Sequence, residues 1–238
     1  MRFGHPRYIQ DKYIPFSEVF MESYSSQLLE SIFSNLSLKP NGYFCSERVL
    51  FSCLQYLGGA TELGSLFSLL VDKLDFVLLQ VLFPELCMKS DEIIIYEEDP
   101  QEFIRQNHSI IEEFYDVNFM ASNIMREFCE NRPSETMPVL FDFCIENLND
   151  YASTFENDSS ADQLDQEAQL NLYINKHGIM NIFISIDDVL LRNSQLSCQL
   201  EEMFMTHVIP EFKSPIGFMR AKVLFFIFFI ILFFFILC

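Results

Sequence analysis

The residue types that most often carry out catalysis are present in this chain, but their spacing fits no catalytic or metal-binding pattern. The four histidines are scattered, and no HExxH, Gly-x-Ser-x-Gly or glycine-rich phosphate-binding motif accompanies them. The 34 acidic residues are numerous, yet nothing in the sequence pairs two of them for acid–base chemistry. We therefore expect no catalytic, metal-binding or cofactor-binding residues, and we predict that the chain is not an enzyme.

The cysteines indicate a reducing environment. All seven are spaced without a CxxC pair and without a histidine at metal-ligand spacing. This pattern is typical of reduced, buried thiols in a nuclear or cytoplasmic protein. The first seven residues, MRFGHPR, contain no apolar run of the kind that forms a secretory signal.

The charge balance restricts the classes of partner. Lys and Arg number 15 against 34 Asp and Glu, which gives a net charge of −19. Such a charge disfavours nucleic acids and anionic membrane surfaces and favours basic partners. The sequence also has no basic patch interleaved with aromatic residues, so we expect no nucleic-acid binding.

Apolar residues recur at spacings of three and four along most of the chain, which predicts a series of amphipathic helices. The expected helices cover residues 17–38, 46–57, 61–83, a helix that begins at Asp99, 118–129, 134–148, 164–175, 179–191 and 195–211. Glycine-containing turns at residues 39–42, 58–59 and 177–178 are expected to separate some of them. The only strand-like run, Ile93–Tyr96, is too short to build a sheet. The sequence therefore predicts an all-α fold, and the pattern fits a helical solenoid and a closed bundle equally well.

Residues 149–165 form the longest candidate loop. The carboxylates Asp150, Glu156, Asp158, Asp162 and Asp165 give this segment a strongly acidic character. They are candidate contacts for a basic protein partner, and the alternative interpretation is a mobile, solvated linker between two helices.

The segment that begins at Tyr96 reads YEEDPQEFIR. Asp99 is placed to cap a helix, Pro100 fits its first position, and Glu102 lies three residues after the cap, as in a capping box. The segment resembles the EDP-x-E-[FY]-[IV]-R element of the importin-seven and importin-eight branch of the importin-β (karyopherin) superfamily. Four further segments match that family in the same order, namely Arg48–Leu50, Met137–Leu140, His207–Pro210 and Gly217–Lys222. The family-motif positions are Asp99, Pro100, Glu102, Arg105 and Arg220.

The resemblance implies a fold, a function and a location. It implies that residues 17–222 form an internal fragment of a HEAT-type, armadillo-like α-solenoid of antiparallel helix pairs, preceded by an irregular segment at residues 1–16. It further implies a nuclear transport receptor that carries basic protein cargo between cytoplasm and nucleus. Ran GTPase is a partner of the family, but the family's Ran-binding repeats precede the region of resemblance, so we do not expect Ran binding here.

The last 16 residues, 223–238, are an unbroken apolar run, VLFFIFFIILFFFILC. As a helix this run would span about 24 Å, less than the ~30 Å hydrocarbon core of a bilayer. One interpretation is a marginal tail anchor, which would make the chain a membrane-anchored protein with an acidic helical domain facing the cytosol. The favoured interpretation is translated non-coding sequence, because every residue from Val223 to Leu237 is of a type encoded with U at the second codon position.

Overall fold

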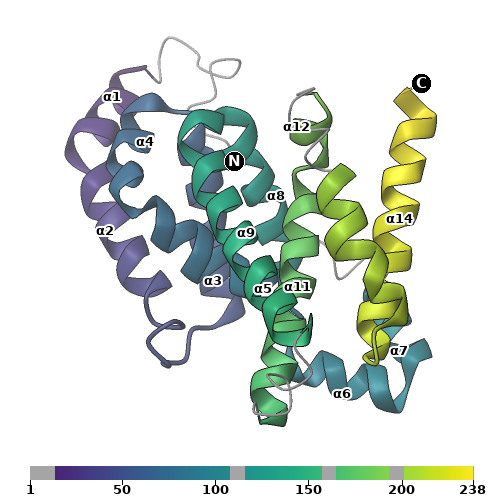
Figure 1. Ribbon diagram of the computed structural model, residues 1–238. Coiled ribbons are helices and arrows are strands. Elements are labelled where there is room, and N and C mark those ends of the chain that lie inside the picture. The colour runs from purple at the N-terminus through teal and green to yellow at the C-terminus, as the bar shows by residue number, and fades with distance from the viewer. Residues whose placement is uncertain (1–13, 108–115, 157–164, 193–200, 238) are drawn as a thin grey trace.

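The computed structural model describes residues 14–107, 116–156, 165–192 and 201–237, and these residues form helices and connecting turns with no strand among them. The helices lie side by side in a series that begins with α1 and α2 and ends with α14 (Figure 1). The main packing contacts follow this series, from α2 to α3, from α3 to α8, from α8 to α11 and from α11 to α14. The predicted all-α helical-repeat architecture is confirmed.

The α-helices of the first half are α1 (Ile14–Ser23), α2 (Ser25–Leu36), α3 (Glu47–Thr61), α4 (Gly64–Leu70), α5 (Phe83–Leu86), α6 (Ser90–Glu98) and α7 (Pro100–Asn107). A 3-10 turn η2 (Val71–Lys73) and a π-helix η3 (Phe76–Leu82) join α4 to α5. The second half contains α8 (Val117–Asn131), α9 (Pro133–Glu156), α11 (Gln166–Ser185), α12 (Asp187–Leu191), η5 (Phe204–Val208), η6 (Ile209–Lys213) and α14 (Gly217–Leu237). The first helix begins at Ile14, so the end of the predicted irregular segment at residues 1–16 is helical.

Three glycines expected in turns, namely Gly58, Gly59 and Gly178, lie inside helices. Helix α3 begins after its cap Ser46, whose hydroxyl accepts the Val49 N–H at 3.4 Å, but it continues through Gly58 and Gly59 to Thr61. Helix α11 likewise passes through Gly178 without a turn. A Cβ at Gly58 would lie 2.4 Å from Glu127 Oε2 on α8, and one at Gly178 would lie 2.5 Å from Cys87 Sγ. These glycines allow neighbouring helices to approach closely, and this role explains why they do not terminate the helix.

Two further segments are helical where the sequence did not predict a helix. The strand-like run Ile93–Tyr96 lies in α6, where only Ile93 of the three isoleucines is buried. Helix α9 extends to Glu156, so residues 149–156 of the predicted acidic loop are helical. Pro138 lies inside this helix and lacks the N–H that would otherwise bond to the Ser134 carbonyl.

Helix α14 joins a family-like motif to the apolar run. Phe218, Met219, Val223 and Phe226 are buried at helical spacing, and α14 packs against α11 and η6. The first residues of the apolar run therefore contribute to the core of the helical stack. Within the part of the chain that the structure describes, no helix is both long enough and apolar enough to cross a membrane. The tail-anchor interpretation gains no support.

Candidate functional site

The predicted helix start at Asp99 is confirmed. One carboxylate oxygen of Asp99 accepts the backbone N–H groups of Gln101 and Glu102, both at 3.1 Å. The Asp99 N–H is already bonded to the Ile95 carbonyl at the end of α6. The Glu102 carboxylate pairs with Arg105, whose Nε lies 2.7 Å from Glu102 Oε2. Asp99 is therefore a helix cap, whereas Glu102 and Arg105 form an exposed ion pair one turn apart along α7.

Two of the family-like segments, far apart in sequence, meet in space. The Tyr96 ring covers Gly217, since a Cβ at position 217 would lie 3.1 Å from Tyr96 Cε1. Tyr96 also packs edge-on against Phe103, with ring centroids 5.3 Å apart. Arg220 holds the turn before α14, because its Nη1 donates to the carbonyls of Ser214 at 2.6 Å and Pro215 at 3.0 Å. The family-like residues therefore position helices, and among their contacts none forms a catalytic arrangement.

A buried ion pair joins three helical elements near this contact. Lys176 of α11 and Glu211 of η6 are 3% and 5% exposed, and Lys176 Nζ lies 2.7 Å from Glu211 Oε1. Tyr151 of α9 donates its hydroxyl to the same oxygen at 2.8 Å, and the Lys176 ammonium lies 3.7 Å from the centre of the Tyr151 ring. Burial lowers the pKa of Lys176, and the Glu211 carboxylate opposes this shift. The cluster fixes the relative positions of α9, α11 and η6.

A second polar contact holds α14 to α11. Lys222 donates to Asn181 Oδ1, and Asn181 Nδ2 donates to the Leu86 carbonyl at 2.6 Å. Burial lowers the pKa of the Lys222 ammonium to about 7. Burial also lowers the pKa of His177 well below its usual value, and the nearby Lys222 adds to this shift. His177 packs edge-on against Phe218, at 6.1 Å between ring centroids.

Of the five acidic residues predicted to contact a basic partner, Asp150 and Asp165 have side chains that the structure describes. Asp150 lies on α9 and is exposed, whereas Asp165 caps α11 by accepting the Ala168 N–H at 2.7 Å. Glu156 is the last residue of α9. Asp158 and Asp162 lie outside the described residues. Of the five residues, Asp150 is thus the exposed carboxylate that the structure places on a helix face.

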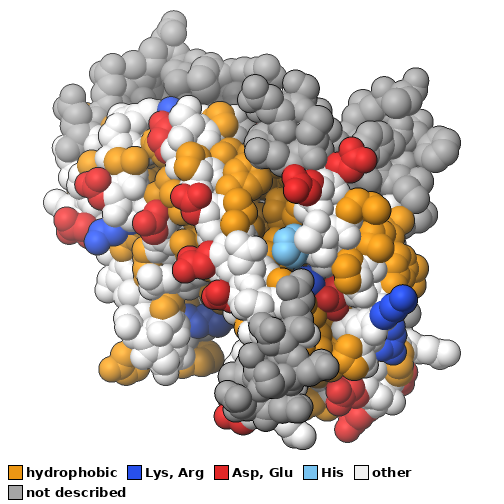
Figure 2. Space-filling model, in the orientation of Figure 1, with side chains coloured by type: hydrophobic (Ala, Val, Ile, Leu, Met, Phe, Trp, Pro, Cys, Tyr) orange, Lys and Arg blue, Asp and Glu red, His pale blue; other side chains and the backbone are white. Residues whose placement is uncertain are grey.

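Helix α9 presents an acidic stripe that the sequence analysis missed. Asp142, Glu146 and Asp150 are exposed and spaced four residues apart, so they follow one face of the helix. Over its 24 residues α9 contains neither lysine nor arginine. Ile145, which is 57% exposed, lies beside the stripe. The signal was the spacing of four. Asp142 and Glu146 lie in the expected helix at residues 134–148, but Asp150 falls in the expected loop. Figure 2 shows acidic side chains on both sides of a hydrophobic band on the visible face.

The described cysteines are free thiols in packed surroundings. Cys87, Cys129 and Cys144 are buried, and burial raises the pKa of each thiol to about 12. Such thiols are poor nucleophiles and poor metal ligands. Among the described residues, no three histidine, cysteine or acidic side chains gather in a way that could hold a metal ion.

Comparisons with known proteins identify relatives of the chain. An importin beta-like SAD2 homolog from Arabidopsis thaliana is 27% identical over 221 residues, which cover 93% of this chain and 20% of that protein. Importin-8 from Mus musculus is 23% identical over the same shares of both chains. A probable importin-7 homolog from Dictyostelium discoideum is 27% identical over 210 residues, which cover 87% of this chain and 18% of that protein. The chain is a relative of the importin-β family. No protein-family model and no solved structure matches the chain.

The importin relationship covers nearly all of the chain, including the packed motif segments described above. The chain spans about a fifth of the length of the curated relatives it matches. Within the family-like segments, Leu50, Val208 and Met219 are buried and pack helices together, whereas the motif residues Asp99, Arg105 and Arg220 are exposed.

Proposed function

We propose that this chain forms part of an importin-like nuclear transport receptor and that its surface contacts basic segments of protein cargo during transport between cytoplasm and nucleus. The observation that carries the proposal is the match to importin-8 and the importin-7 homolog over 87–93% of the chain. The net charge of −19 supports the class of cargo, because acidic surfaces attract lysine-rich and arginine-rich segments.

The acidic stripe on α9 is the surface that fits such cargo best. Three exposed carboxylates four residues apart repel one another along a helix, a mildly unfavourable arrangement that a basic partner would relieve. The neighbouring Ile145 offers an apolar surface for the aliphatic stems of lysine or arginine. We assign Asp142, Glu146 and Asp150 as cargo contacts.

Titration of the full chain with a fluorescently labelled lysine-rich histone-tail peptide tests the proposal. Binding is expected at about 0.01 M salt and should weaken strongly at about 0.15 M, since the screening length falls from about 30 Å to about 8 Å. The triple variant Asp142→Asn, Glu146→Gln, Asp150→Asn should weaken binding by about threefold or more, because each exposed ion pair contributes about 0.2–1 kcal/mol.

A second triple variant provides the matched control. Glu30→Gln, Asp72→Asn and Asp75→Asn change the charge by the same amount at exposed positions of α2, of η2 and directly before η3. The affinity of this control for the peptide should lie within about twofold of that of the unmodified chain, because distant charges are screened by salt. Equal weakening by both variants would show that net charge alone attracts the peptide. Absence of binding at both salt concentrations would contradict the proposal itself.

A further inference from the structure

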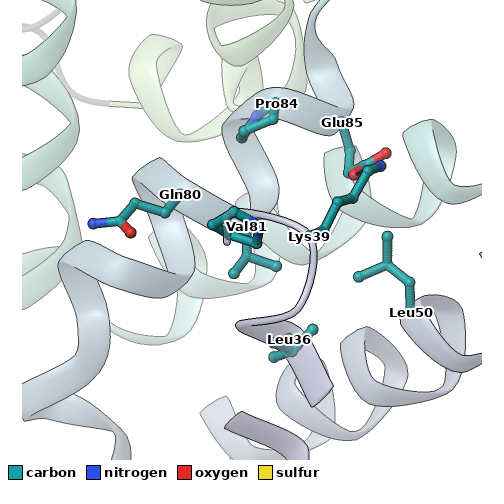
Figure 3. Close-up of a pocket in the computed structure, with 8 residues that line it drawn as sticks. Leu36, Lys39, Leu50, Gln80, Val81, Pro84 and Glu85 are labelled. Carbon is teal, nitrogen blue, oxygen red and sulfur yellow. Dashed lines mark hydrogen bonds and ion pairs between the residues drawn. The ribbon is translucent and has the colours of Figure 1, made fainter. Parts of the chain in front are cut away.

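Glu85 is a buried carboxylate that lines a small pocket between the first helices. It belongs to α5 and is 1% exposed. The pocket has a volume of about 100 Å³ and is lined by Leu36, Lys39, Pro40, Leu50, Gln80, Val81, Pro84 and Glu85. Figure 3 shows Lys39 and Glu85 pointing toward one another across it. A buried acid in a mainly apolar pocket is unusual unless a cation accompanies it.

The cations around Glu85 satisfy only part of its carboxylate. Lys39 Nζ donates a hydrogen bond to Glu85 Oε1. Oε2 is buried and receives no hydrogen bond from any described residue. The Lys89 ammonium lies 3.7 Å from Oε2, beyond hydrogen-bond distance, and is also 4.0 Å from Glu47 Oε1. One oxygen in the pocket therefore lacks a donor.

Lys39 occupies the pocket from an exposed turn. Its side chain is 47% exposed, whereas Glu85 is almost fully enclosed. Lys39 follows α2, in a turn that Gly42 closes with a φ of 78° and an N–H bonded to the Lys39 carbonyl at 2.9 Å. The Lys39 side chain can therefore leave the pocket by rotating about its own bonds, without any change in the helices.

The lining of the pocket matches a long basic side chain. Leu36, Leu50 and Val81 are 1%, 2% and 4% exposed and provide an apolar wall. Lysine and arginine combine an apolar stem with a cationic end, so the stem would contact the wall while the charge meets the carboxylate. Arginine could donate to both oxygens of Glu85 at once.

We propose that the Glu85 pocket binds a lysine or arginine side chain of a basic protein partner, and that Lys39 is its exchangeable occupant in the unbound chain. The inference rests on the proposed function, since it takes the same class of partner. Glu85 and Glu47 balance the charges of Lys39 and Lys89. An additional cation would be uncompensated, so the incoming side chain must displace Lys39.

This competition makes a testable prediction about Lys39. Lys39→Ala in the full chain removes the tethered competitor and should tighten binding of the lysine-rich peptide by about fivefold or more, because a short tether gives Lys39 an effective concentration in the millimolar range. Lys73→Ala is the matched control, since Lys73 is exposed on η2 and its loss changes the net charge equally. That control should change affinity by less than about twofold.

A modified peptide and a second substitution test whether the increase in affinity arises at the Glu85 pocket. Replacing the peptide lysines by norleucine should abolish the difference between Lys39→Ala and Lys73→Ala. Adding Glu85→Gln to Lys39→Ala should return affinity to the unmodified level, and the peptide comparison remains decisive if that double variant does not fold. If Lys39→Ala and Lys73→Ala change the affinity for the peptide equally, the proposal that the Glu85 pocket binds a basic side chain is wrong. The proposed function would still stand in that case, provided that peptide binding depends on the acidic stripe of α9. Failure of both the unmodified chain and Lys39→Ala to bind would contradict both.

Discussion

At the scale of single residues, a charged side chain is buried in the core where a neighbouring helical element provides a side chain of opposite charge. Lys176 and Glu211 are buried together, and Tyr151 from a third helix donates to the same carboxylate oxygen. Such a pair contributes little net stability compared with apolar residues, because desolvation offsets the attraction between the charges. Its removal one partner at a time is nevertheless costly. The pair therefore specifies how the three elements dock.

Lys176→Met should lower the free energy of unfolding by about 3–5 kcal/mol, because Glu211 would stay buried without its cation. The double variant Lys176→Met, Glu211→Leu should recover most of this loss. Urea unfolding of the purified chain, followed by circular dichroism, measures both. If Lys176→Met and the double variant are equally stable to within about 0.5 kcal/mol, the pair does not act as a unit.

At the scale of helices, the cap residue Asp99 was predicted correctly, whereas Gly58 and Gly178 were wrongly placed in turns. The cap at Asp99 can be recognised from neighbouring residues alone, because Asp99, Pro100 and the acidic residue of the first turn lie within four positions of one another. Gly58 and Gly178 look like helix ends in sequence. Their actual roles depend on Glu127 of α8 and on Cys87, the residue that follows α5. A glycine at a close helix crossing and a glycine at a turn differ only in their tertiary neighbours.

The two kinds of helical glycine should respond oppositely to alanine. Gly178→Ala is expected to destabilise the chain by about 1–3 kcal/mol through overpacking, because its Cβ would lie 2.5 Å from Cys87 Sγ and 2.9 Å from Phe83 Cε2. Gly59→Ala meets no atom within 4 Å and should stabilise α3 by about 0.5–1 kcal/mol through higher helix propensity. Thermal unfolding measures the stability of both variants. If Gly178→Ala stabilises the chain, α11 is not closely packed at this position.

At the scale of the whole molecule, the periodicity of apolar residues predicted the fold class and the composition set the net charge, but neither predicted the arrangement of the surface. Periodicity sufficed for an all-α chain because each helix carries its own apolar face. The acidic stripe on α9 escaped notice because residues 149–156 were assigned to a loop. The Glu85 pocket could not be foreseen, since Lys39, Leu50 and Glu85 come together only in the folded chain.

The net charge of −19 should make the stability of the chain depend on salt. Repulsion between carboxylates opposes compaction, and raising salt from about 0.01 M to about 0.15 M screens it. The melting temperature should therefore rise over this range. Differential scanning fluorimetry in sodium chloride measures it, with sucrose at matched osmolality as a control for effects other than screening. A falling melting temperature would show that attractive ion pairs outweigh the repulsion.

The contact between Tyr96 and Gly217 links the evolution of two distant segments. Position 217 has little room for a side chain, because a Cβ there would lie 3.1 Å from Tyr96 Cε1, closer than most Cβ contacts. A larger residue at position 217 therefore requires the ring at position 96 to shift or to be replaced by a smaller side chain. Among related chains these two positions should vary together, so that the pair is inherited as one steric unit although 120 residues separate its members.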